Sequence, residues 1–173
     1  VTGTHSVIIA GESNRTSAKN SVVVAGSTNE VASQGSVILT GLNNQVDGVF
    51  STVLGGNSND ATGPYSAVVG GASNTASGES AVVAGGQAGE ASGRSSAVLS
   101  GMGSTASGST SAVVAGSLNV ASAANSAILG GYENEATADN SSVGGGYWNN
   151  SDTIGAWTAG VYTTSTDLYE VAY

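Results

Sequence analysis

Residues 111–125 read SAVVAGSLNVASAAN, and residues 66–79 read SAVVGGASNTASGE. Both segments join a short aliphatic run to a Gly, and then place an Asn and a small apolar residue at the same spacing. Ten such copies follow one another with a period of fifteen, except for one interval of fourteen followed by one of sixteen. The starting residues are Ser6, Ser21, Ser36, Ser51, Ser66, Ser80, Ser96, Ser111, Ser126 and Ser141. A fixed period with one residue type per column predicts similar coils stacked on one another.

Each copy is too short for a pair of helices with their connections, so the coils are predicted to be built of strands. Runs such as Val22-Val23-Val24 are β-branched and bounded by Gly and polar residues, as short strands are. We expect two strands per coil, each paired with its counterpart in the next coil at ~4.8 Å. The sequence therefore predicts an all-β parallel β-solenoid of ten coils over residues 6–151, about 50 Å long. Residues 1–5 would form a lead-in, and residues 152–173 an aromatic-rich C-terminal cap or tip.

The composition agrees with a thin structure and limits the partners. Hydrophobic residues make up 39% of the 173 residues but aromatic residues only 5%, and such small side chains cannot fill a wide core. Three basic and twelve acidic residues give a net charge of −9, which argues against nucleic-acid binding and against attraction to anionic membranes. No apolar run approaches the ~20 residues of a spanning helix, so no direct membrane insertion is expected.

An Asn follows the Gly of most copies by three positions, and this column has a structural explanation. Identical Asn residues stacked at a corner can form a hydrogen-bonded ladder without any ligand. Ala88 and Ser104 are expected to replace the Asn in the two central copies, where the spacing of the Ser residues also shifts. The predicted ladder consists of Asn14, Asn29, Asn44, Asn59, Asn74, Asn119, Asn134 and Asn149.

The first strand of each coil is apolar on both faces. Side chains alternate along a strand, so the third residue of each copy would point into the coil and the fourth would point out of it. The predicted outward row consists of Ile9, Val24, Leu39, Leu54, Val69, Val83, Leu99, Val114 and Leu129. A monomer seldom exposes so long an apolar stripe, so we expect this row to be buried against other copies of the chain.

The copies in residues 66–79 and 111–125 resemble the head repeats of trimeric autotransporter adhesins, the YadA-like family, whose repeat reads roughly Ser-Val-Ala-Ile-Gly-x-x-Ala-x-Ala-x-Gly-x-x. The resemblance covers residues 6–151, although the present coil is one residue longer and Asn replaces the family's first Ala. It implies a left-handed parallel β-roll, three chains side by side, an extracellular or cell-surface location and a role in adhesion. Similar small-residue repeats occur in phage tail fibres, which are trimeric and recognise host surfaces, so a virion is the alternative setting.

Residues suited to catalysis are scarce. His5 is the single His and precedes the first full copy, so the many Ser residues have no base to activate them. The acidic residues are scattered, and no acidic loop of the EF-hand type is found. We therefore expect no enzymatic activity, no cofactor and no metal.

Aromatic residues gather towards the C-terminus, where the repeat fades. They can cover the unpaired strand edges of the last coil, or they can form a binding tip for a host-surface protein or glycan. The candidate tip residues are Tyr147, Trp148, Trp157 and Tyr162. Two functions remain open: a trimeric fibre segment for adhesion or receptor binding, and a structural spacer that supplies only length and stiffness. Ice binding fits less well, because Thr residues such as Thr16 and Thr62 are irregularly placed.

Overall fold

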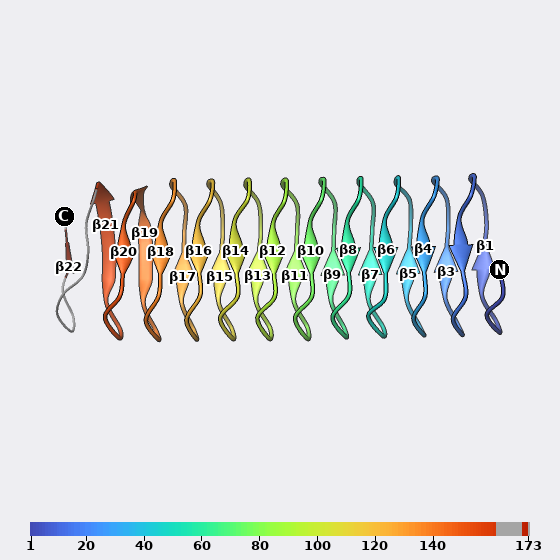
Figure 1. The fold of residues 1–173 in the computed structure, drawn as a ribbon, viewed down its shortest axis with the longest axis horizontal. Helices are drawn as coiled ribbons and strands as arrows, with labels where there is room; N and C mark the ends of the chain where they lie inside the picture. Colours follow the sequence, from blue (N-terminus) through green and yellow to red (C-terminus); the bar gives the residue numbers. More distant parts are fainter. Residues whose placement is uncertain (162–170, 173) are drawn as a thin grey trace.

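The protein is a β-solenoid. The structure is a computed structural model and describes residues 1–161 and 171–172. Two parallel sheets run along the molecule, and the described residues contain no helix. The coils follow one another in chain order along the long axis (Figure 1). This confirms the predicted all-β fold of about ten coils with a period of fifteen.

Each coil contributes one short strand to each sheet. The first sheet contains β1 (Val7–Ile8), β3 (Val22–Val23), β5 (Val37–Ile38), β7 (Thr52–Val53), β9 (Ala67–Val68), β11 (Val82–Val83), β13 (Ala97–Val98), β15 (Ala112–Val113), β17 (Ala127–Ile128), β19 (Ser142–Tyr147), β21 (Trp157–Val161) and β22 (Val171–Ala172). The second sheet contains β2 (Arg15–Thr16), β4 (Glu30–Val31), β6 (Gln45–Val46), β8 (Asp60–Ala61), β10 (Thr75–Ala76), β12 (Glu90–Ala91), β14 (Thr105–Ala106), β16 (Val120–Ala121), β18 (Glu135–Ala136) and β20 (Asn150–Ser151).

The register is constant from β1 to β20, which corrects the irregular spacing expected around Ser80. Val82 pairs with both Ala67 and Ala97, so the period of fifteen holds on each side of this coil. Ala81 therefore occupies the place of the usual Ser, and Ser80 lies at the preceding corner with φ 58°. A parallel ladder keeps its pairing only if successive coils have equal length, and this requirement overrides residue identity. We number the positions of each coil from 1 at Ser6, Ser21 and their equivalents, including Ala81.

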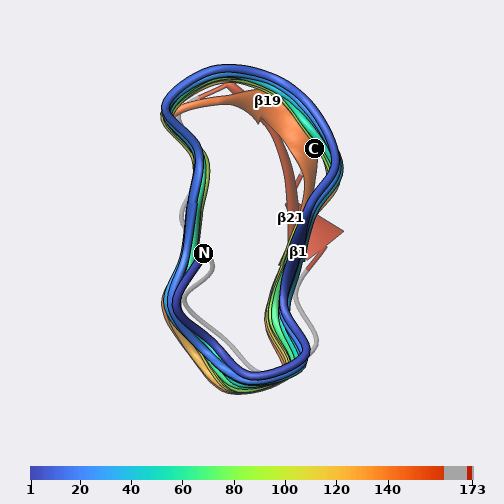
Figure 2. The same cartoon turned by 90° about the vertical axis from the view of Figure 1, so that its right-hand side faces the viewer.

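The core lies between the two sheets and is narrow. In each coil the side chain at position 3, on the first strand, and the side chain at position 11, on the second strand, point inward. Ile38 and Val46 are such a pair in one coil, and both are fully buried. The side chain at position 11 becomes smaller after Val46, and from Ala61 to Ala136 it is Ala in every coil. The two sheets can therefore approach each other closely. Figure 2 looks along the rod, where the coils overlay as one closed outline. This geometry explains why a chain with few large side chains folds.

Position 6 requires Gly because successive coils meet there. Gly26 has φ +101°, and an added Cβ would lie 2.2 Å from the carbonyl oxygen of Gly41 in the next coil. The same clash recurs in neighbouring coils, for example between Gly56 and Gly71 at 2.3 Å. A side chain at this position would force the coils apart, so the Gly column sets the close stacking.

The solenoid continues beyond both ends of the predicted repeat domain. Thr2 donates its backbone N–H to Thr16 in the next coil, and Asn20 donates to Thr4. At the other end β21 pairs with β19, with a register shift between Val143 and Gly145. Residues 1–5 and 152–161 therefore belong to the solenoid, because their backbone satisfies the same ladder. Tyr162 lies outside the described residues.

Candidate functional site

The side chains of the Asn residues at position 9 form hydrogen bonds between neighbouring coils. The Asn29 side chain receives the backbone N–H of Asn44 at 3.0 Å and donates from Nδ2 to the carbonyl of Gly41 at 2.9 Å. Asn59 and Asn74 repeat this pattern, and the Asn residues from Asn29 onward are buried. The side chains therefore satisfy backbone groups that would otherwise be buried without partners, which is a structural role.

The interruption of this column differs from the one predicted. Gly89, not Ala88, lies at position 9, and its backbone N–H donates to Asn74 Oδ1 at 2.8 Å. Ala88 lies at position 8 with φ 53°, as its neighbours at that corner do. Ser104 follows Gly89 in the column and accepts the N–H of Asn119 at 3.3 Å. The difference follows from the constant coil length, because the expected shift in spacing does not occur.

The outward row of the first sheet is largely exposed in the single chain. Ile9 is 66% exposed and Leu54 is 40% exposed, while Val24 and Val114 are half-buried. Val83 does not belong to this row, because the constant register puts it at position 3, where it is fully buried. Ala84 takes its place at position 4 and is half-buried.

Positions 2 and 4 together form a continuous surface that we call the apolar face. At position 2 it contains Val7, Val22, Val37, Thr52, Ala67, Val82, Ala97, Ala112, Ala127 and Ser142. At position 4 it contains Ile9, Val24, Leu39, Leu54, Val69, Ala84, Leu99, Val114, Leu129 and Gly144. Every charged side chain between residues 6 and 155 lies at positions 7 to 15 of its coil, off this face. The rod therefore has one uncharged side along its whole repeat length.

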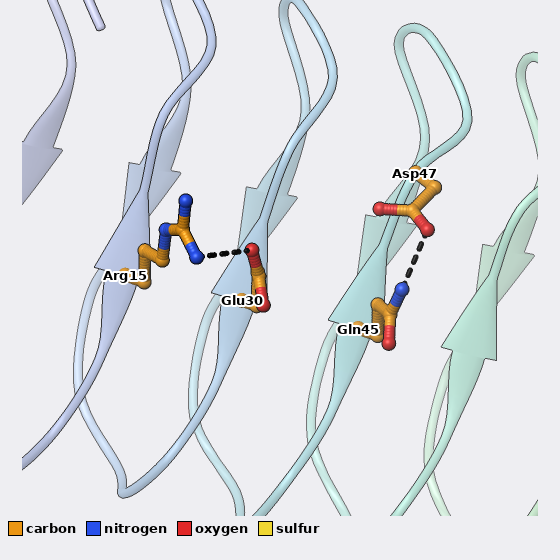
Figure 3. Close-up of polar contacts among 4 residues, drawn as sticks. All are labelled: Arg15, Glu30, Gln45 and Asp47. Carbon is orange, nitrogen blue, oxygen red and sulfur yellow. Dashed lines mark hydrogen bonds and ion pairs between the residues drawn. The ribbon is translucent and has the colours of Figure 1, made fainter. Parts of the chain in front are cut away.

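The outer surface of the second sheet is polar. Arg15 and Glu30 on adjacent strands form an ion pair at 3.5 Å, and Gln45 Nε2 donates to Asp47 Oδ2 at 2.5 Å (Figure 3). The pKa of the half-buried Asp60 is raised, mainly by burial and in addition by the nearby charge of Asp47. Exposed pairs of this kind contribute little to stability, so this surface is a solvated one.

Two of the predicted tip residues come together near the C-terminal end. Tyr147 stacks on Tyr132 with ring centroids 5.2 Å apart, and on Trp148 with centroids 5.0 Å apart. The Trp148 indole N–H donates to Glu133, and a hydrogen bond to the same carboxylate raises the pKa of Tyr132. Tyr132 and Glu133 were not among the predicted site residues. The period of fifteen indicates them, because Tyr132 lies one period before Tyr147 and Glu133 one period before Trp148.

Trp157 belongs to a different surface from this aromatic cluster. It lies at position 2 of the coil that begins at Ala156, opposite Ser142 of the preceding coil. Its ring covers Gly144, because a Cβ added to Gly144 would lie 2.5 Å from Trp157 Cζ2. Trp157 is therefore an extension of the apolar face. The structure divides the predicted tip between two sides of the rod.

Two hollows lie over the Asn column, each bordered by side chains at positions 8 and 10. A hollow of about 350 Å³ is lined by Leu118, Glu133, Glu135, Trp148, Asn149 and Asn150. A second hollow of about 310 Å³ is lined by Thr28, Glu30, Asn43, Asn44, Gln45, Ser58 and Asp60. Both hollows use positions 8, 9 and 10 of the coil, so they lie on the same side of the rod.

Side chains able to bind a metal ion are not gathered into a group in the described part of the chain. His5 lies exposed at a corner, with φ 57°. Within residues 1–161 and 171–172, no three His, Cys, Asp or Glu side chains form a group able to hold a metal ion. The same residues include no helix long and apolar enough to cross a membrane.

No family model matches the chain, and no curated protein matches it. The likeness to YadA-like repeats therefore remains an expectation from the sequence. Two surfaces are candidates for a function: the apolar face, and the hollow lined by Trp148 with its aromatic cluster.

Proposed function

We propose that this chain is a non-enzymatic segment of a fibre, in which three copies lie side by side and present their remaining surfaces for adhesion or receptor binding. The setting would be extracellular, on a bacterial surface or a phage tail. The single observation that supports this most strongly is the apolar face, which is exposed in the single chain and contains no charged residue.

The size of the apolar face suits an interface. Ten coils at ~4.8 Å each give a length of about 48 Å, and the two outward rows with their side chains are about 12 Å wide. The resulting ~600 Å² per chain approaches the ~800 Å² that each partner contributes to a standard interface. At ~25 cal/mol per Å², its burial is worth about 15 kcal/mol per chain before the entropic cost of association is subtracted.

The charge distribution also favours association through this side. Each chain carries a net charge of −9, so identical chains repel one another wherever their charged surfaces meet. Packing through the apolar face keeps the acidic side chains of positions 7 to 15 away from the contact. The number of three chains rests on the resemblance to trimeric adhesins, since two copies would also bury the face.

Light scattering coupled to size-exclusion chromatography tests the assembly. We expect a mass three times the 16.6 kDa of one chain. The variant Leu54→Asp/Leu99→Asp places charges on the apolar face and should give monomers with an unchanged β-type circular dichroism spectrum. The matched control is Thr75→Asp/Thr105→Asp at position 10, which should remain trimeric. A wild-type monomer with a folded spectrum would refute the assembly.

The alternative function is that of a structural spacer, which the constant register from β1 to β20 favours because identical stacking of these coils makes a stiff rod. The two functions differ in what the isolated protein binds. A fibre for adhesion should retain glycans or host-surface proteins in a binding screen, whereas a spacer should retain none.

A further inference from the structure

We infer that the hollow beside Trp148 is a binding site for a neutral pyranose sugar. This deepens the proposed adhesive function and rests on it. The site combines three features within three neighbouring coils: a stacked aromatic row, a hollow of about 350 Å³, and polar side chains that line the hollow.

The aromatic row supplies a flat surface of the kind that packs against the C–H face of a sugar ring. Tyr132, Tyr147 and Trp148 stack nearly parallel, with interplanar angles of 9° and 20°. Trp148 is 48% exposed and lines the hollow. Glu133 receives the indole N–H, so the orientation of the ring is fixed before a ligand arrives. A rigid, partly exposed aromatic ring loses little entropy on binding, which suits it to recognition.

The polar groups of the hollow match the hydroxyl groups of a sugar. Glu133 and Glu135 supply carboxylates as strong acceptors, and Asn150 supplies an amide. Asn150 is held in place by a hydrogen bond from Thr137 Oγ1 at 3.1 Å. The volume lies at the lower end of the ~300–1,000 Å³ found for ligand pockets, so the site suits a small ligand or the end of a glycan.

The geometry distinguishes a neutral sugar from two other ligands. Acidic sugars such as sialic acid would meet two carboxylates in a chain of net charge −9. Quaternary ammonium ions are bound by aromatic rings that surround the cation. In this protein the rings are stacked on one another and do not surround a space, and Trp148 is the one that lines the hollow.

The site would stay accessible in the proposed trimer. Its residues lie at positions 7 to 10, whereas the apolar face is made by positions 2 and 4. Its counterpart hollow near the N-terminus uses the same positions of the coil but is lined only by polar side chains. The aromatic residues therefore distinguish this hollow from its counterpart.

Calorimetric titration and saturation-transfer NMR on the intact protein test this inference, with glucose, galactose, mannose and N-acetylglucosamine as probes. Sialyllactose and choline are included for contrast. We expect at least one neutral sugar to bind with a dissociation constant in the millimolar range. The variant Trp148→Ala should weaken this binding about tenfold or more, and Trp148→Phe should restore part of it. Ala88 already occupies position 8 in another coil, so the Ala variant should fold.

The matched control is Trp157→Ala, the same substitution on the other side of the rod, which should leave sugar binding unchanged. The inference is wrong if none of the four neutral sugars binds, if Trp148→Ala binds them as tightly as the parent protein, or if only choline or sialyllactose binds. The molecular mass of each variant separates this result from the fibre proposal. A trimer without sugar binding overturns the site alone, and a monomer that binds sugar overturns the assembly alone.

Discussion

Replacing Asn59 by Ala removes three contacts of a buried side chain at once. Its Nδ2 donates to the carbonyls of Gly55 and Gly71, both at 3.0 Å, and its Oδ1 accepts the backbone N–H of Asn74 at 3.0 Å. Each buried polar group left without a partner costs ~1–3 kcal/mol. Two of the three groups, the Gly55 carbonyl and the Asn74 N–H, belong to buried residues, so the free energy of unfolding should fall by about 2–6 kcal/mol.

Urea unfolding followed by circular dichroism measures this change, at one fixed protein concentration so that any association affects all variants equally. The control is Asn57→Ala, which removes an exposed Asn of the same coil whose Oδ1 accepts a hydrogen bond from Ser58 Oγ at 3.0 Å. It should change the free energy of unfolding by less than ~0.5 kcal/mol. A loss below ~1 kcal/mol for Asn59→Ala would show that the ladder is not needed to satisfy the backbone.

Three further predictions concern the core, the polar surface and metal ions. Val113→Asp places a carboxylate in the fully buried position 3 column and should cost several kcal/mol; an unchanged melting temperature would disprove the inward assignment. Burial raises the pKa of Asp60 above its ordinary value of 3.8, so its charge opposes folding and stability should fall as pH rises above that value. Asp60→Asn should therefore raise the melting temperature at pH 7 and have little effect at pH 3, and equal shifts at both would contradict this reasoning. EDTA should leave the melting temperature unchanged, and a large drop would reveal a metal site.

The period and the inward columns could be predicted because each column repeats one kind of side chain. The register at Ala81 could not be predicted from residue type, because this coil has Ala at position 1 and a Ser directly before it. Aligning the copies on Ser therefore places Ser80 at position 1 instead of Ala81. That single shift also misplaced Val83 and made Ala88, instead of Gly89, the replacement for Asn. The physical rule that would have prevented these errors is that parallel coils in one ladder must have equal length.

The candidate site was predicted only in part for a related reason. The density of aromatic residues near the C-terminus predicts Tyr147, Trp148, Trp157 and Tyr162 as one group. The solenoid instead brings together residues that are one period apart, so Tyr132 joins Tyr147 while Trp157 faces another side. In a coiled chain, position within the coil decides proximity more than distance along the sequence does.

The constant register has a consequence for how such a chain can change in length. Each coil of the repeat bonds to the coil before and the coil after it, through the same backbone groups. Removing or duplicating one whole coil would therefore shorten or lengthen the rod by one step of ~4.8 Å and leave every remaining ladder intact. Inserting a single residue would instead turn the following side chains to the opposite face at that coil. Genetic variation in such a protein should accordingly occur in whole coils, so that reach can be adjusted independently of the surfaces that the rod carries.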